Sequence, residues 1–435
     1  MPTPHARPIT EHPVFLVVEQ VGTGGITRAV FNQAAILTEH GFGDVTVATV
    51  DPERSDFLDK AERGGLWPEG VKARNLPEEW PQEWAAAQGD ERRVTALKLR
   101  WLEQLGSGSP AKPYVIAEHR ETISLVQRVS GRRAIKIALV HDNQFATGRK
   151  TAIPTIADTN REQMLGALWS LHALVGLTEH QTGDLRKLAG RWGARVFSAP
   201  NEAHMPAVDF PAPDPHKITI VSRLIPRKRI SEILHAFAIV VAQRPDAKLD
   251  IYGGGASKTS LMELSRSLGL DDSVQFFVST LTPLDAMATG HFGILTSTSE
   301  AMPLTLLESY SVARPVISYR FRYGPESMIR DGVTGYLVDD KDREGLAARM
   351  IELLDDPEKA LSMGRAGREF AREQYSREQV WLAWERFLTA ARDNRAWRLP
   401  PFLFRLRVPL RGERVPILAA AYRFTSRRVR KAIGW

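Results

Sequence analysis

Short apolar runs alternate with longer segments of helical periodicity along most of the chain. Apolar runs bounded by glycine, proline or charge are typical of strands buried on both faces of a parallel sheet. Segments such as 230–241 repeat apolar residues at helical spacing between these runs. The predicted strands are 14–18, 45–50, 114–117, 136–140, 175–178, 196–198, 217–221, 248–252, 274–277, 292–295, 315–318 and 336–338. The alternation predicts an α/β fold with two doubly wound, Rossmann-like domains that face each other across a cleft.

A proline-rich stretch between residues 200 and 215 divides this pattern into two halves. Such links occur where few contacts cross between domains. The 435 residues, 43% of them apolar, suffice for two cores. The predicted parts are a first domain over 1–205, a second over 206–375, a helix over 376–395 and a tail over 396–435. The pattern does not place residues 51–112, which are rich in tryptophan, proline and charge.

Two glutamates lie where a ligand is expected in the second half. Glu300 falls in the loop after the strand 292–295, and Glu308 falls about one turn into a helix that starts near Pro303. Open parallel sheets bind ligands at this edge, where the free amides and dipole of a helix start attract phosphate. The pair therefore predicts a phosphate site. Two ordinary solvated acids near a helix start are the alternative.

Basic residues are expected at the same edge of the second half. Arg223 follows the strand 217–221 closely, and Lys228 comes five residues later. Cations aimed at the leaving oxygen of a nucleotide diphosphate lower the barrier to its departure without a metal. A solvated basic turn is the alternative. No Asp-x-Asp triplet follows a strand, since 339–342 resembles a helix start, so no metal is implied.

Two features of the first half also lie at strand ends. Gly24 and Gly25 belong to a strand, glycine loop and helix unit that suits phosphate, although tight turns need glycine for backbone reasons too. The spacing is neither the dinucleotide fingerprint nor a Walker loop. His141 follows the strand 136–140 and is expected to open into the cleft. A structural histidine that caps the strand end is the alternative.

Together these residues resemble the retaining glycosyltransferases of the GT-B fold. The resemblance rests on Glu300, Glu308 and the runs 313–317 and 222–228, and it extends from about residue 14 to 392. The segment 319–338 is most similar to enzymes that glycosylate wall teichoic acid polyols and adhesin serines. The GT-B fold implies that the C-terminal helix crosses back onto the first domain.

The resemblance also implies a reaction. A hexose or N-acetylhexosamine would pass from a UDP-sugar to an acceptor hydroxyl with retention of anomeric configuration, without a metal or other cofactor. Glu300 would hold a sugar hydroxyl near the reacting carbon, and Glu308 would bind the ribose. Arg223 and Lys228 would stabilise the departing diphosphate.

The remaining positions follow from the same resemblance. The amides of Leu304 and Thr305 would cradle the diphosphate, and His141 would lie beside the transferred sugar. Gly24 and Gly25 would let the backbone approach the diphosphate or the acceptor.

Two departures from the family pattern are present. Stricter members read Glu-Gly-Phe-Gly where this chain has the run 300–303, so an amide donor is lost at Pro303. Ala313 replaces a family glycine. Neither change removes a charged group, so we expect activity to persist with a reshaped sugar pocket.

Charge points to an anionic partner. The net charge is +7 and the isoelectric point about 9.6. Residues 395–435 contain ten arginines and one lysine against a single acid, interleaved with aromatics. Such a tail suits an anionic membrane surface, a phosphate polymer or nucleic acid, with a solvated tail as the alternative. We expect an anionic polymer or glycolipid acceptor and no nucleic acid; a peripheral membrane contact and a homo-oligomer stay open.

The location expected from these features is the cytoplasm, including the inner face of the plasma membrane. There is no cysteine, no long apolar run and no secretory signal at residues 1–5.

Two other classes of protein remain open. A GT-B-fold binding or chaperone subunit of a protein glycosylation complex would be expected to lack the set formed by Glu300, Glu308, Arg223 and Lys228. A basic nucleic-acid-binding protein is favoured by charge alone, without a recognised module.

Overall fold

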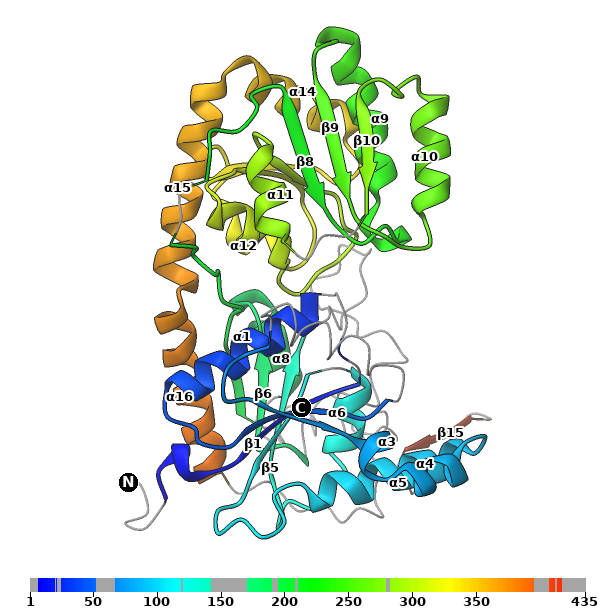
Figure 1. Ribbon diagram of the computed structural model, residues 1–435, viewed down its shortest axis with the longest axis vertical. Helices are drawn as coiled ribbons and strands as arrows, with labels where there is room; N and C mark the ends of the chain where they lie inside the picture. Colours follow the sequence, from blue (N-terminus) through cyan, green and yellow to red (C-terminus); the bar gives the residue numbers. More distant parts are fainter. Residues whose placement is uncertain are drawn as a thin grey trace. The chain divides into compact units, whose positions relative to one another are not determined.

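The chain forms two compact units in a computed structural model. The model describes residues 7–19, 21, 25–51, 67–118, 120–141, 170–189, 195–207, 210–278, 282–394, 407–410 and 413–416. Unit 1 consists of Met1–Ala199 and Trp381–Trp435, and unit 2 of Pro200–Val380 (Figure 1). The division falls at the start of the proline-rich stretch.

The described residues of unit 1 form a parallel sheet of seven strands in the order β3-β2-β1-β4-β5-β6-β7. The strands β1, β2, β4, β5 and β6 are buried throughout, which explains their continuous apolar sequences. The strand order reverses between β1 and β4. Val14 of β1 pairs with Val45 of β2 on one side and with Tyr114 of β4 on the other. The strands are β1 (Val14–Val18), β2 (Val45–Thr49), β3 (Lys72–Asn75), β4 (Tyr114–Ala117), β5 (Ile135–Val140), β6 (Ala173–Gly176) and β7 (Arg195–Ser198).

Helices connect these strands. Between β3 and β4 lie three helices in the segment that the sequence pattern does not place. Asn75 and Asp90 start two of them, since their side chains accept hydrogen bonds from first-turn amides. The helices of unit 1 before the division are α1 (Gly25–Glu39), α3 (Leu76–Glu79), α4 (Pro81–Ala87), α5 (Glu91–Gln104), α6 (Arg120–Val126) and α8 (Glu179–Ala189), with a 3₁₀ turn at Ile9–Glu11.

The helix α16 (Arg377–Asp393) returns the chain to unit 1. From Trp381 onward its residues belong to that unit, where Trp381 stacks on His40 with ring centroids 4.0 Å apart. The Tyr114 hydroxyl donates to the carbonyl oxygen of Leu388 at 3.1 Å. After it, β14 (Arg407–Leu410) and β15 (Glu413–Pro416) form an antiparallel pair, and the rest of the predicted tail lies outside the described residues.

In the described part of unit 2, six parallel strands form two groups, β10-β9-β8 and β11-β12-β13. A parallel bridge between Ile218 and Phe292 joins β8 to β11. The combined order is that of the dinucleotide-binding fold, with its reversal at β8 and β11. The strands are β8 (Lys217–Val221), β9 (Lys248–Tyr252), β10 (Val274–Phe277), β11 (Gly293–Leu295), β12 (Val316–Tyr319) and β13 (Gly335–Val338).

The helices of unit 2 alternate with its strands. The predicted helix start at 339–342 is present, because Asp342 accepts a hydrogen bond from the Gly345 amide at 2.8 Å and α14 follows. The helices are α9 (Ile230–Gln243), α10 (Lys258–Ser267), α11 (Pro283–Thr289), α12 (Leu304–Ser311), α13 (Pro325–Met328), α14 (Arg343–Asp355) and α15 (Pro357–Tyr375), with a 3₁₀ turn, η3, at Pro226–Lys228.

Helix α15 holds α12 in place by close packing at two glycines. A Cβ at Gly364 would collide with the carbonyl oxygen of Ala313, and one at Gly367 would collide with the Tyr310 ring. Ala313 itself adopts φ 55°, the left-handed conformation that ends many helices and that glycine adopts without strain. The departure from the family glycine therefore lies at a strained residue.

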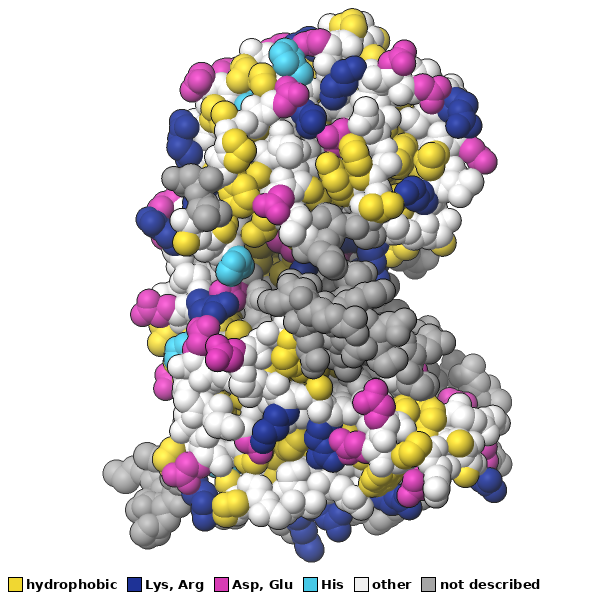
Figure 2. Space-filling model, in the orientation of Figure 1, with side chains coloured by type: hydrophobic (Ala, Val, Ile, Leu, Met, Phe, Trp, Pro, Cys, Tyr) yellow, Lys and Arg dark blue, Asp and Glu magenta, His cyan; other side chains and the backbone are white. Residues whose placement is uncertain are grey.

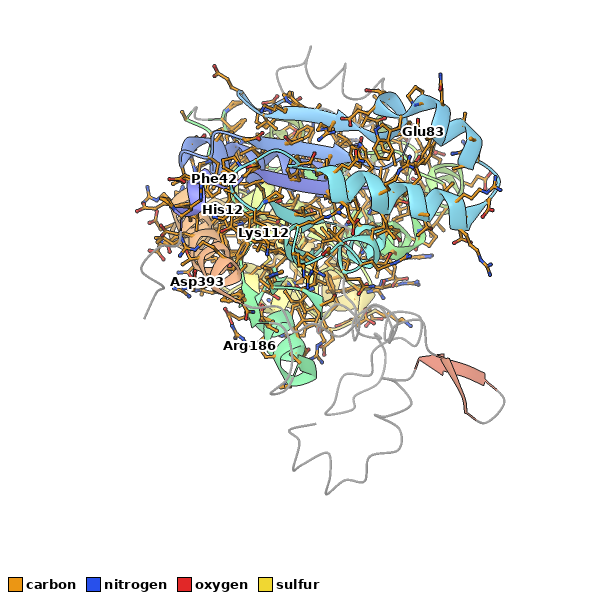
Figure 3. The ribbon with its side chains drawn as sticks, turned by 90° about the horizontal axis from the view of Figure 1, so that it is seen from below. His12, Phe42, Glu83, Lys112, Arg186 and Asp393 are labelled. Atoms are coloured by element: carbon orange, nitrogen blue, oxygen red, sulfur yellow. The ribbon has the colours of Figure 1, made fainter. Side chains whose placement is uncertain are left out.

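Charges of both signs are dispersed over the described surface. On the face drawn in Figure 2, lysine and arginine side chains are interspersed with aspartate and glutamate over both units. Seen from below in Figure 3, unit 1 presents His12 beside Lys112; the His12 ring nitrogen Nδ1 donates to the Lys112 carbonyl oxygen at 2.6 Å.

No helix among the described residues has both the length and the hydropathy needed to cross a membrane.

Candidate active site

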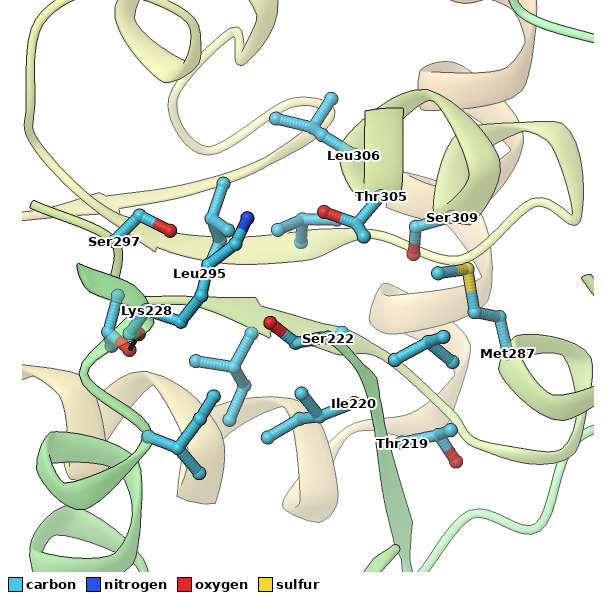
Figure 4. A pocket seen from close by; sticks show the side chains of 16 residues that line it. Thr219, Ile220, Ser222, Lys228, Met287, Leu295, Ser297, Thr305, Leu306 and Ser309 are labelled. Carbon is cyan, nitrogen blue, oxygen red and sulfur yellow. Dashed lines mark hydrogen bonds between the residues drawn. The ribbon is translucent and has the colours of Figure 1, made fainter. Parts of the chain in front are cut away.

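A pocket opens in unit 2 where β8 and β11 separate. The two strands are hydrogen-bonded near their amino ends, where the His291 amide donates to the Lys217 carbonyl oxygen at 2.7 Å. Figure 4 shows the pocket with the hydroxyl groups of Ser222, Thr305 and Ser309 around it. Because the strand order reverses here, the pocket lies where open α/β sheets bind ligands.

The loops after these two strands are tied together. The Arg229 side chain donates to the carbonyl oxygens of Thr296, at 2.8 Å, and Ser297, at 3.1 Å. In return, the Thr296 hydroxyl donates to the carbonyl oxygens of Lys228 and Arg229 at 3.0 and 3.1 Å. These bonds fix the backbone on both sides of the pocket mouth without using the Lys228 ammonium group.

Lys228 and Glu300 meet across this mouth, as the sequence predicts. Lys228 Nζ lies 2.6 Å from Glu300 Oε1, and their side chains are 11% and 12% exposed. Arg227 lies farther from the same carboxylate, with Nη1 3.7 Å from Oε2. The Tyr323 amide donates to the Glu300 carbonyl oxygen at 3.0 Å and holds that backbone. The arrangement places a cation and a carboxylate, both slightly exposed, beside the pocket that Lys228 lines.

Helix α12 starts next to this pair. Its N-cap, Pro303, provides no side-chain hydrogen bond, so the first-turn amides of Leu304 and Thr305 are not capped by that residue. Gly324 packs against Pro303 so closely that a Cβ there would collide with the proline ring. The helix start thus presents its positive dipole end at the pocket, in which Thr305 is a lining residue.

The other predicted residues of unit 2 lie near but apart from the ion pair. Arg223 is exposed, just after the end of β8. Glu308 lies in the second turn of α12 and is partly buried. The structure therefore brings together Lys228 and Glu300, with Arg223 and Glu308 on the elements that flank them.

In unit 1, His141 pairs with a residue that sequence reasoning missed. His141 Nε2 lies 2.6 Å from Glu118 Oε2, and the two side chains are 4% and 0% exposed. The His141 side chain is therefore packed against Glu118, as in the alternative of a structural histidine, and its predicted position beside the sugar stays a prediction. Glu118 directly follows the strand β4, so the strand-end signal that selected His141 would also have found it.

One of the two predicted glycines, Gly25, lies at the start of the first helix. Gly25 is the first residue of α1, and Gly24 lies outside the described residues.

Where the structure describes the chain, no three histidine, aspartate or glutamate side chains gather as metal ligands do.

The chain is similar to known proteins in sequence and in fold. Residues 205–370 match the family described as "Glycosyl transferases group 1". The chain is 31% identical over 224 residues to an exopolysaccharide phosphotransferase of Streptomyces coelicolor, covering 51% of this chain and 23% of that protein. It is 24% identical over 306 residues to the poly(glycerol-phosphate) alpha-glucosyltransferase of Bacillus subtilis, covering 69% of this chain and 45% of that protein. The chain thus spans less than half the length of these relatives.

The fold is also that of a solved structure. A TarM mutant of S. aureus, in complex with Fondaparinux, alpha-GlcNAc-glycerol and UDP, superimposes with a TM-score of 0.77 at 16% identity, over 87% of this chain and 99% of that one. The predicted α/β fold class, GT-B with two Rossmann-like domains, is confirmed by this likeness and by the parallel sheets.

Proposed function

We propose that this chain, whose residues 205–370 match the group 1 glycosyl transferases, moves a hexose or N-acetylhexosamine from a UDP-sugar to an acceptor hydroxyl. The observation that supports this best is the Lys228–Glu300 pair at the carboxyl ends of β8 and β11. It lies beside an uncapped helix start at the point where the strand order reverses. A nucleotide diphosphate has the charge and shape for that position.

Each charged group has a role in this reaction. Lys228, with Arg223, stabilises the negative charge that grows on the diphosphate as the sugar leaves. The amides of Leu304 and Thr305 bind the same phosphates at the helix start. Glu300, released from Lys228, accepts a hydrogen bond from a sugar hydroxyl and faces the positive charge near the reacting carbon.

Glu308 binds the ribose hydroxyls, as carboxylates do in related nucleotide folds. That role excludes a glycosidase-like mechanism, because two catalytic carboxylates would have to flank the same glycosidic bond.

We also propose that the transfer retains the anomeric configuration. The bond from the anomeric carbon to the diphosphate oxygen breaks, and the acceptor oxygen bonds to the same face of that carbon. The acceptor proton passes to the departing phosphate oxygen. The name of the B. subtilis relative, an alpha-glucosyltransferase, supports retention, because UDP-glucose is itself α-linked. Side-chain cations supply the charge stabilisation. We therefore propose that the reaction needs no metal ion or other cofactor. Turnover that persists in EDTA is the expected result.

The acceptor class rests on the relatives and on charge. A polyol-phosphate chain is the acceptor that the name of the B. subtilis relative indicates, and TarM was solved with UDP and a GlcNAc-glycerol. The net positive charge of residues 395–435 exceeds the chain's net charge of +7, so the other residues together carry a slight negative charge. This tail is the part of the chain suited to an anionic polymer or a membrane surface at the cytoplasmic face.

Truncation at residue 395 tests the tail. Binding to anionic vesicles or to the polymer should fall more than donor hydrolysis; an equal loss of both would contradict a docking role.

The experiment for the reaction itself uses two lysines of the same strand region. Lys228→Ala should lower the hydrolysis of UDP-sugars and the transfer from them by ~10²–10³, the usual effect of removing a group that stabilises developing charge. Lys217 is the matched control: it forms a 3.2 Å pair with Asp250 at the amino end of β8. Lys217→Ala should leave turnover unchanged. Equal turnover of wild type and Lys228→Ala would refute the assignment, and a wild type inactive with every nucleotide sugar would favour a binding subunit.

A further inference from the structure

The hydroxyl group of Ser297 is buried at the pocket in unit 2 without a hydrogen-bond partner. Ser297 lines this pocket together with Lys228, and it is 0% exposed. Among the described residues, none forms a hydrogen bond with its Oγ atom. The buried hydroxyls of Thr296 and Ser309 line the same pocket, and both donate to carbonyl oxygens, at 3.0 and 3.2 Å. Ser297 therefore differs from its neighbours in having a polar group that the free protein does not use.

Such a hydroxyl group lowers the stability of the folded chain. A buried polar group loses its hydrogen bonds to water, and this loss is offset only when a partner in the protein replaces them. Most buried side-chain polar atoms do have a partner. An alanine would occupy the same place without the cost of burying a hydroxyl. The serine is therefore better explained by a partner that arrives in another state of the site.

Two hydrogen bonds hold the backbones of Ser297 and Lys228 at the same pocket mouth. Arg229, which follows Lys228, donates from its side chain to the Ser297 carbonyl oxygen at 3.1 Å. Thr296, which precedes Ser297, donates from its hydroxyl to the Lys228 carbonyl oxygen at 3.0 Å. Figure 4 shows the side chains of Ser297 and Lys228 both pointing into the pocket. Because the backbones are fixed, rotation of the flexible lysine stem is enough to change the partner of its ammonium group.

The present partner of Lys228 lies on the same loop as Ser297. Glu300, three residues farther along the chain, has its Oε1 atom 2.6 Å from Lys228 Nζ. In the proposed function, Lys228 leaves this carboxylate when the diphosphate binds. An ammonium group has three hydrogens to donate, and a hydroxyl oxygen can accept one of them. The Ser297 hydroxyl is thus an acceptor that Lys228 does not use while it is paired with Glu300.

We propose that Ser297 is a positioning residue, whose hydroxyl accepts a hydrogen bond from the Lys228 ammonium group when Lys228 turns from Glu300 to the diphosphate. The inference rests on the proposed function for the presence of that diphosphate. Ser297 acts through Lys228 and needs no contact with the donor, so its complete burial is compatible with the role. The hydrogen bond holds the ammonium group toward the negative charge that develops on the leaving oxygen.

Initial rates and calorimetry of Ser297→Ala test the proposal. We expect kcat with a UDP-sugar and the affinity for UDP each to fall roughly 10-fold, because a hydrogen bond to a charged group is lost. Both losses should be smaller than those of Lys228→Ala. The double variant Ser297→Ala, Lys228→Ala should be no slower than Lys228→Ala alone, since Ser297 acts through Lys228. If the two losses multiply in the double variant, Ser297 acts independently of Lys228 and the proposal is wrong.

Stability separates this role from a purely structural one. Ser297→Ala removes a buried hydroxyl without a partner, so its melting temperature in the absence of ligand should equal or exceed that of the wild type. Ser318 is the matched control, because it is also 0% exposed but its hydroxyl donates to the Leu295 carbonyl oxygen at 3.2 Å. Ser318→Ala should have a lower melting temperature and an unchanged kcat. A lower melting temperature of Ser297→Ala would show that its hydroxyl has a partner in the free protein, and it would overturn the proposal.

The same measurements distinguish failure of this inference from failure of the proposed function. If the wild type binds UDP and transfers a sugar, and Ser297→Ala does both equally well, only the role of Ser297 is refuted. If the wild type binds UDP but transfers no sugar, the proposed reaction fails, and an unchanged UDP affinity of Ser297→Ala would still refute the hydrogen bond to Lys228. A wild type that does not bind UDP would overturn both.

Discussion

Each unit places a carboxylate and a cationic or protonatable partner at the carboxyl ends of two strands, but the two pairs differ in access. Lys228 and Glu300 in unit 2 are 11% and 12% exposed. Glu118 and His141 in unit 1 are 0% and 4% exposed. Part of each side chain in the first pair is therefore exposed, whereas the second pair is almost completely covered. In the proposed function, the more exposed pair exchanges partners when the donor binds, and the covered pair keeps its geometry.

The loops around the Lys228–Glu300 pair, called the open pair from here on, are held by other hydrogen bonds. The Arg229 and Thr296 hydrogen bonds hold the loops on both sides without the Lys228 ammonium group. Lys228 has three hydrogens to donate, and a diphosphate bears more negative charge than Glu300. The Lys228–Glu300 ion pair can therefore separate while these hydrogen bonds keep the loop backbones in place.

The largest expected effect comes from breaking the open pair from each side. Glu300→Gln should lower turnover by ~10²–10³ while UDP affinity is retained, because the proposed function gives Glu300 a contact with the sugar and none with the phosphates. Lys228→Ala should lower both turnover and UDP affinity, the latter by roughly 10- to 100-fold for a lost charged hydrogen bond. Calorimetry with UDP and initial rates with a UDP-sugar separate the two. Equal losses of UDP affinity in both variants would mean that the pair acts only as a structural unit.

A smaller effect concerns His172, a buried group at the opposite edge of the sheet in unit 1. Burial, with added repulsion from Lys112 and Lys136, lowers the pKa of His172 to about 3 from 6.5. The unfolded chain therefore binds a proton below pH 6.5 that the folded chain does not, so the folded state loses stability as pH falls through this range, by roughly 1.4 kcal/mol per pH unit.

Urea unfolding of wild type and His172→Gln at intervals from pH 7 to pH 4 measures this effect. The variant should lose less stability on acidification than the wild type, with turnover at neutral pH unchanged. Parallel pH curves for the two proteins would contradict a neutral, buried His172.

The smallest effect is expected at the end of α12, where a substitution should change stability but not turnover. Ala313 ends α12 at φ 55°, so Ala313→Gly should relieve backbone strain and raise the free energy of unfolding by about 0.5–1 kcal/mol. Turnover should stay the same, because the change is at the far end of α12 from Leu304. A drop in stability measured by urea unfolding would show that the alanine methyl group packs usefully there.

Most of the sheet could be predicted because parallel strands buried on both faces have continuous apolar sequences. The strand β3 (Lys72–Asn75) could not: it is an edge strand with two exposed residues, so its sequence has no apolar run. The helices α3 to α5 could not be placed from the sequence for a related reason. They are short or have mixed surfaces, and their start signals at Asn75 and Asp90 lie within a charged segment.

The candidate site was predictable where the chemistry lies on loops next to recognisable strands. Lys228 and Glu300 are 72 residues apart in sequence, but each follows a predicted strand, and the two strands are neighbours. Burial was not predictable. A histidine after a strand gives no sign of whether its ring turns outward or inward, and His141 turns toward Glu118, a partner whose own strand-end position was overlooked.

A crystal structure of the chain with UDP bound tests the central claim most directly. We predict that the diphosphate lies between the ends of β8 and β11 and the start of α12, with Lys228 Nζ on a phosphate oxygen and no longer on Glu300. UDP bound elsewhere, or bound while Lys228 stays paired with Glu300 and away from the phosphates, would contradict the account.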